Sequence, residues 1–212
     1  MNEKQSNKMM GILVEHQSEF SGLTSPEGQW VIRNPKLAIA LFVEVIRNQP
    51  KPIERIRVIN ETTIMVNLDA PSNPLLNGAK IEFQIGSSWV KVEKRSDGLY
   101  VDDRRVTLHL SERQKGKKDL PGYELQKELE GKPTLHPNIM DALFENPYLI
   151  PEDWKKDEKG NILYIFFWAV VFRSDFGSRY VRYFSFNGGW NRNHCSLEEG
   201  WNLSDPAALL AS

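Results

Sequence analysis

The stretch "ILYIFFWAVVF" (Ile162–Phe172) is the longest run of apolar residues in the chain. It is about half as long as the roughly 20 residues that a membrane-spanning helix needs. β-Branched and aromatic residues dominate the run, and both kinds are typical of strands. We therefore interpret it as the buried central strand of a sheet, and we predict no membrane span.

The residues that follow this run predict its neighbours in the sheet. "YVRYFSFNGGWNRNHC" (Tyr180–Cys195) contains two strand-like segments around "NGG" (187–189), a sequence typical of a hairpin turn. Together with the run 162–172, these segments predict a three-stranded antiparallel meander. The remaining residues, 196–212, have no such pattern and are predicted to form a loose tail. Its apolar residues Trp201, Leu209 and Leu210 are the ones that could dock on the rest of the protein.

A helix is predicted near the N-terminus, in "NPKLAIALFVEVIRNQP" (34–50). Asn34 can cap this helix, Pro35 suits its first position, and Pro50 cannot be part of its interior. Apolar residues recur on one side, which predicts a wide buried stripe. The stripe consists of Leu37, Ala38, Leu41, Phe42, Val45 and Ile46. A shorter helix is expected before it, in "GILVEHQSEF" (11–20).

From residue 53 to residue 110, apolar residues alternate with polar ones, as they do in half-buried strands. Turn sequences at "SDG" (96–98) and "DD" (102–103) predict that the last three of these strands form an antiparallel meander. Another helix is predicted to begin near Pro137 and to end at Pro147, because proline suits a first turn and interrupts a helix interior.

These patterns predict an α+β protein in three parts. Residues 11–110 form an N-terminal α+β domain, in which a helix accompanies an antiparallel β-meander. Residues 111–135 form a charged linker that carries one short polar helix, because charge, glycine and proline interrupt the strand pattern there. Residues 136–212 form a C-terminal β-rich module, with one helix and the three-stranded antiparallel meander.

Composition excludes several classes of protein. The 27 Lys and Arg residues balance 28 Asp and Glu residues, so no global charge attracts nucleic acid or an anionic membrane. The single cysteine, Cys195, fits a reducing compartment, and with the polar N-terminus it predicts a cytoplasmic protein. The four histidines have no zinc-site spacing, and no phosphate-loop or dinucleotide motif occurs. We therefore expect no metal and no cofactor.

Arginines and aromatic residues gather around the predicted C-terminal hairpin. The leading hypothesis is a non-catalytic binding module that recognises a protein partner through this surface. The predicted binding residues are Arg173, Arg179, Arg182, Tyr183, Trp190 and Arg192. The competing interpretation is structural, because the same aromatic side chains would also pack against a helix with arginines lying over their rings.

Two other functions stay open. The same surface, helped by the basic patch Lys115–Lys118, would suit a nucleic-acid-binding protein. An enzyme would need Cys195 as its nucleophile or a pair of facing carboxylates. His194 is the neighbour of Cys195 on one predicted strand, so the two side chains are expected on opposite faces and not as a dyad. The adjacent carboxylate pairs all fall in turn-like sequence.

Overall fold

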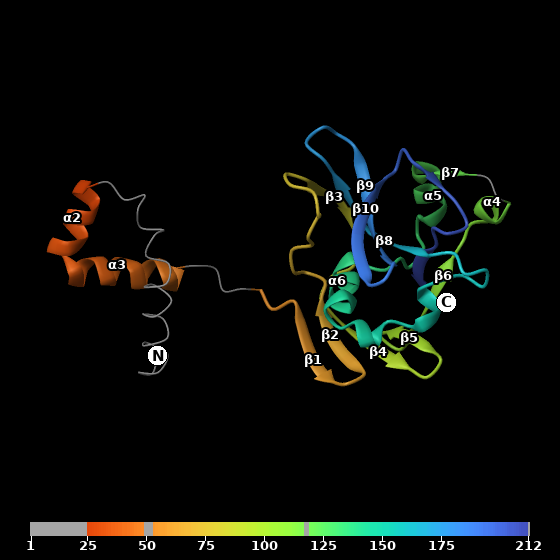
Figure 1. Ribbon diagram of the computed structural model, residues 1–212, viewed down its shortest axis with the longest axis horizontal. Helices are drawn as coiled ribbons and strands as arrows, with labels where there is room; N and C mark the ends of the chain where they lie inside the picture. Colours follow the sequence, from red (N-terminus) through yellow and green to blue (C-terminus); the bar gives the residue numbers. More distant parts are fainter. Residues whose placement is uncertain (1–24, 49–52, 117–118, 212) are drawn as a thin grey trace. The chain divides into compact units, whose positions relative to one another are not determined.

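The computed structural model describes residues 25–48, 53–116 and 119–211. The chain divides into two compact units, residues 1–52 and residues 53–212, and each is described by itself (Figure 1). The short helix expected at 11–20 lies outside the described residues.

The described part of the smaller unit consists of two helices, α2 (Ser25–Arg33) and α3 (Pro35–Asn48). The helix predicted after Asn34 is therefore confirmed. The prediction that its apolar stripe is buried is wrong for the described residues, because Leu37, Leu41 and Val45 are all exposed. Within the described part of this unit, α3 has only α2 as a neighbouring element, and one nine-residue helix leaves most of the stripe uncovered.

A curled ten-stranded sheet dominates the larger unit (Figure 1). Its strands are β1 (Ile56–Asn60), β2 (Thr63–Asn67), β3 (Lys80–Gln84), β4 (Trp89–Arg95), β5 (Gly98–Val101), β6 (Arg104–His109), β8 (Tyr164–Arg173), β9 (Arg179–Phe186), β10 (Trp190–Ser196) and β12 (Ala207–Leu210). Their order is β1-β2-β4-β5-β6-β12-β8-β9-β10, and β3 pairs with β8 beside this path. Every pairing is antiparallel except that of β12 with β8. The α+β class, the antiparallel sheet and the β4–β5–β6 meander are confirmed.

Short helices and one small ribbon complete this unit. They are α4 (Glu112–Lys115), α5 (Gly122–Leu129), α6 (Pro137–Glu145), the 3-10 helices η2 (Pro147–Leu149) and η3 (Glu152–Trp154), and the two-stranded ribbon of β7 (Leu120–Pro121) with β11 (Gly200–Trp201). The helix expected near Pro137 is confirmed as α6. His136 caps it, because the Nδ1 atom of that histidine accepts a hydrogen bond from the Asn138 amide at 3.1 Å.

The predicted three-stranded meander exists as β8–β9–β10, but it is only part of the ten-stranded sheet. The tail is not loose, because Ala207 of β12 pairs with His109 of β6 on one side and with Phe166 of β8 on the other. A central strand has two edges to satisfy with hydrogen bonds, and β9 occupies only one edge of β8. Strands from 11–110 and 136–212 therefore share one sheet. Whether 11–110 and 136–212 fold independently on either side of 111–135 stays a prediction.

The segment predicted as a charged linker is folded, apart from residues 117–118, which are not described. Leu125 and Leu129 of α5 are buried one turn apart against Trp201 and its neighbours. A Cβ atom at Gly122, the first residue of α5, would lie 2.6 Å from Nε1 of Trp201, so the close approach requires glycine there. The sequence did not predict this packing, because the apolar residues of α5 are few and lie among charges, while their partners lie far along the chain.

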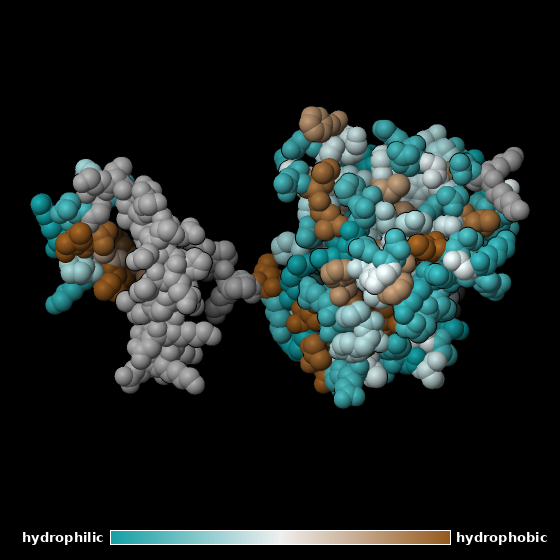
Figure 2. Space-filling model, in the orientation of Figure 1, coloured by the Kyte–Doolittle hydropathy of each residue, from teal (hydrophilic) through white to brown (hydrophobic). Residues whose placement is uncertain are grey.

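Apolar clusters cover both faces of the sheet. One cluster joins α6, η2 and η3 to one face and includes Phe167 and Phe184. The other joins α5 and the β7–β11 ribbon to the opposite face and includes Phe166 and Val181. Strand β8 is buried from residue 165 to residue 172, which confirms it as a central strand. The surface of the larger unit in Figure 2 is mainly hydrophilic, interrupted by small hydrophobic patches.

The cap residue of α6 makes stability depend on pH. Burial lowers the pKa of His136 from 6.5 to about 4. As the pH falls from 6.5 to 4, the unfolded chain binds a proton that the folded protein does not, so the free energy of unfolding decreases, by up to about 3 kcal/mol. Urea unfolding across this range measures the effect. His136→Asn keeps a capping oxygen and does not titrate, so its curve should be flatter, and parallel curves would contradict the assignment.

Candidate functional site

Two of the predicted binding arginines lie in a buried ion cluster around Asp141 of α6. Arg182 is fully buried, and its Nη1 and Nη2 atoms donate to the two carboxylate oxygens of Asp141 at 2.9 and 2.6 Å. Arg192 donates to Asp141 Oδ1 at 2.8 Å, and Arg55, just before β1, donates to Oδ2 at 3.2 Å. These arginines bind the protein's own carboxylate and join the sheet to α6.

The two predicted aromatic residues also contact other side chains of the protein. The ring of Trp190 meets Phe184 edge-on at 4.9 Å, and the ring of Tyr183 lies 4.8 Å from that of Phe166. Arg192 lies over Phe144 of α6 at 4.1 Å. For Tyr183, Trp190 and Arg192, these contacts favour the structural interpretation of the hairpin.

The remaining two arginines converge on Glu82 of β3. Arg173 donates through Nε and Nη2 to both oxygens of Glu82, at 3.0 and 3.1 Å, and Arg179 donates through Nε at 3.1 Å. Hydrogen bonds from Arg173, reinforced by the charges of both arginines, lower the pKa of Glu82 below its ordinary value. Arg179 also donates through Nη2 to the side-chain oxygen of Gln126 in α5, at 3.0 Å. The six predicted residues are thus divided between Asp141, Glu82 and two separate aromatic contacts.

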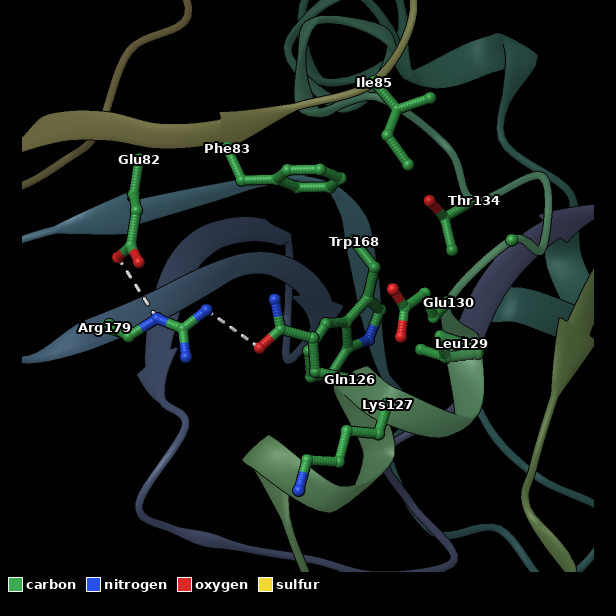
Figure 3. A pocket seen from close by; sticks show the side chains of 11 residues that line it. Glu82, Phe83, Ile85, Gln126, Lys127, Leu129, Glu130, Thr134, Trp168 and Arg179 are labelled. Carbon is green, nitrogen blue, oxygen red and sulfur yellow. Dashed lines mark hydrogen bonds and ion pairs between the residues drawn. The ribbon is translucent and has the colours of Figure 1, made fainter.

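Arg179 lies at one end of a pocket of about 430 Å³ (Figure 3). The pocket is lined by Glu82, Phe83, Ile85, Gln126, Lys127, Leu129, Glu130, Gly131, Thr134, Trp168 and Arg179. Figure 3 shows Phe83 above and Trp168 in the middle, with Glu82 and Arg179 on the left and Ile85, Thr134 and Glu130 on the right. This volume and the mixture of aromatic walls with a few polar groups are typical of small-molecule sites.

Irregular pairing on two strands accompanies the pocket. On β8 the register with β9 passes from Phe167–Arg182 to Phe172–Tyr180, so four residues, including Trp168, lie opposite one. On β3 the register with β8 shifts between Ile81 and Phe83, at Glu82. In a regular strand Glu82 and Phe83 would face opposite ways, whereas both line the pocket. Such bulges redirect side chains and occur beside functional sites more often than elsewhere.

Several polar groups of the pocket have no hydrogen-bond partner among the described residues. They include Nε1 of the buried Trp168 and Oγ1 of Thr134. The Nη1 atom of Arg179 also has no partner there, because this guanidinium donates to Glu82 through Nε and to Gln126 through Nη2. An unpartnered buried polar group costs about 1–3 kcal/mol, so native structures retain few of them. This pocket contains two.

The residues proposed for an enzyme and for nucleic-acid binding have fewer features of a functional site. Burial raises the pKa of Cys195 to about 11, so its thiol stays protonated near neutral pH. Lys115 pairs with Glu112 at 2.7 Å, and residues 117–118 lie outside the described part of the chain.

Among the described residues there is no group of three or more His, Cys, Asp or Glu side chains that could hold a metal ion. No described helix is long and apolar enough to cross a membrane.

Comparison with known proteins adds no assignment. No family model matches the chain, and neither a curated protein nor a solved structure matches it significantly. The candidate site therefore depends on its own geometry.

Sequence reasoning found Arg179 but missed the rest of the pocket. Trp168 was expected in a buried strand, and Glu82 and Phe83 in an ordinary alternating strand. The only local signal is the length of the apolar run, which exceeds that of a typical strand and leaves room for a bulge. Nothing local indicates that α5 and β3 lie on either side of Trp168.

Replacing Asp141 by asparagine should destabilise the larger unit by about 3–5 kcal/mol, because Arg182 would keep a buried charge without a counter-ion. Urea unfolding followed by tryptophan fluorescence measures this loss. Glu152→Gln, which removes an exposed pair with Lys155, is the control and should cost less than about 1 kcal/mol. Equal losses in the two variants would contradict the role of Asp141.

Replacing Thr134 by valine should raise the free energy of unfolding by about 1 kcal/mol, because the change removes an unpartnered buried hydroxyl at constant shape. Thr62→Val is the control, at an exposed threonine whose hydroxyl has a partner. The Thr62 hydroxyl donates to Asn60 Oδ1 at 3.1 Å, so the same change should lower stability there. A loss of stability in Thr134→Val would mean that this hydroxyl has a partner.

Proposed function

We propose that this protein is a non-catalytic binding module and that its pocket beside Trp168 takes a small organic ligand. One observation carries the proposal. An aromatic-walled pocket of about 430 Å³ opens where β8 bulges away from β9, and polar groups without partners line it. An ordinary packing defect would be lined by apolar side chains alone, whereas this pocket has donors from β9, α5 and the loop that carries Thr134.

The first hypothesis from the sequence, recognition of a protein partner, stays a prediction. The feature that supports it is the exposed edge of the sheet at β10. Asn191 and Asn193 of β10 are exposed, and β10 ends the order of the sheet. An edge strand presents unpaired backbone groups to which another chain can add a strand. Four of the six predicted residues contact Asp141 or neighbouring rings, so the backbone of β10 adds an edge that a protein partner could use. A nucleic-acid partner and a cytoplasmic location also remain predictions.

Nuclear magnetic resonance of the ¹⁵N-labelled full chain with a library of fragment-sized compounds tests the pocket. Binders should shift the indole N–H signal of Trp168, assigned by its loss in Trp168→Phe, and the side-chain amide signals of Gln126. A library that shifts neither signal would contradict the proposal.

A filled pocket provides the matched control. Ile85→Trp places an indole in the pocket and should weaken fragment binding at least about tenfold, because the ligand and the new ring compete for the same volume. Ile81→Trp makes the same change four residues earlier, in β3, at a residue that does not line the pocket. The exposure of Ile81 nearly equals that of Ile85, 43% against 42%. Fragments that bind both variants equally would have another site.

A further inference from the structure

We propose that the ligand of this pocket is an amphipathic monocarboxylate, a small molecule with one carboxylate and a short aliphatic or flat aromatic body. This inference rests on the proposed function and adds the chemical class of the ligand. It follows from the separation of charged and apolar groups along the pocket.

Cationic donors dominate one end of the pocket. Arg173 binds both oxygens of Glu82, so Arg179 shares this carboxylate with a second arginine. Lys127 of α5 lines the same pocket and forms no ion pair with a described residue. In Figure 3 Arg179 lies to the left of Trp168, and Lys127 lies below it. Around Glu82, Arg173 and Arg179 place two positive charges against one carboxylate, and this local excess of positive charge favours an anionic group of the ligand.

The geometry of the donors suits a carboxylate. The Nη1 atom of Arg179 and the Nε2 atom of Gln126 have no partner among the described residues. The two side chains are held together by a hydrogen bond of 3.0 Å from Arg179 Nη2 to the side-chain oxygen of Gln126. A carboxylate accepts several hydrogen bonds at once, and bonds between ionised partners are about twice as strong as neutral ones. Glu82 and Gln126 also orient Arg179 before a ligand arrives, so little side-chain freedom is lost on binding.

The rest of the pocket is apolar. Its walls are formed by Phe83 of β3, Ile85 just after that strand, Leu129 of α5 and Trp168 of β8. Phe83 and Ile85 are 46% and 42% exposed, so a ligand body would cover apolar surface that now faces water. The walls would accept either an aliphatic chain or an aromatic ring.

Glu130 limits the ligand to one carboxylate. Its side chain lies at the opposite end of the pocket from Arg179 in Figure 3, and it forms no ion pair with a described residue. A second carboxylate on the far end of the ligand would approach this anion. Like charges in contact cost binding energy, so the pocket should select against dicarboxylates.

Binding of three molecules of equal chain length, octanoate, octan-1-ol and octanedioate, tests the ligand class. The Trp168 indole signal of the full chain reports pocket occupancy. Octanoate should bind at least about tenfold more tightly than octan-1-ol, because only the acid pairs with the cations. Octanedioate should bind at least about threefold more weakly than octanoate. A fourth probe, 4-phenylbutyrate, compares an aromatic body with an aliphatic one.

Matched lysine variants identify the charged end. Lys127→Met should weaken octanoate binding by up to about fivefold and leave octan-1-ol unchanged, as expected for the loss of one exposed charge pair. Lys159→Met changes an exposed lysine that does not line this pocket, and it should affect neither ligand.

The outcomes separate the two proposals. Equal affinities for octanoate and octan-1-ol, both abolished by Ile85→Trp, would overturn the carboxylate inference and leave the proposed function standing. The same conclusion would follow if other fragments shifted the Trp168 signal while octanoate and 4-phenylbutyrate did not. If no compound of any class shifted that signal, both proposals would fail.

Discussion

The carboxylate of Asp141 is the one group on which the arrangement of the larger unit depends. It is 2% exposed, and it accepts hydrogen bonds from arginines of β9 and β10 and from Arg55 before β1. Arg182 has no exposure at all, so neither charge of the central pair can be left alone without a large desolvation penalty. Helix α6, two strands of the C-terminal hairpin and the entry to the first strand are therefore held in one arrangement.

This interaction also decides which face of β9 can bind a ligand. Side chains alternate along a strand, so orienting Arg182 toward α6 orients Val181 and Tyr183 toward the opposite cluster. Arg179 leaves the strand on that opposite face and meets Glu82 and Gln126. On the same face β8 departs from regular pairing, and Trp168 forms a wall of the resulting pocket. One face of β9 is committed to internal ion pairing, and the other provides the candidate site.

Part of the candidate site could be read from the sequence and part could not. The alternation of the hairpin correctly separates Arg182 from Tyr183, and Arg179 was among the residues expected to bind. Nothing local distinguishes these arginines, because the difference between them lies in the carboxylates that they meet. Asp141 lies 41 residues from Arg182, and Glu82 lies 97 residues from Arg179. Sequence alone therefore predicted a cluster of arginines but not which of them stays near a pocket.

The sequence by itself determined the features that depend on neighbouring residues. Prolines mark the start and the end of α6, turn sequences separate β4, β5 and β6, and a continuous apolar run makes β8 a buried strand. Only the tertiary structure decided that the tail forms β12 between β6 and β8, that α5 packs on the sheet, and that β3 lies beside Trp168. Periodicity and turn chemistry act over a few residues, whereas the pairing of strand edges and the meeting of charges depend on segments about a hundred residues apart.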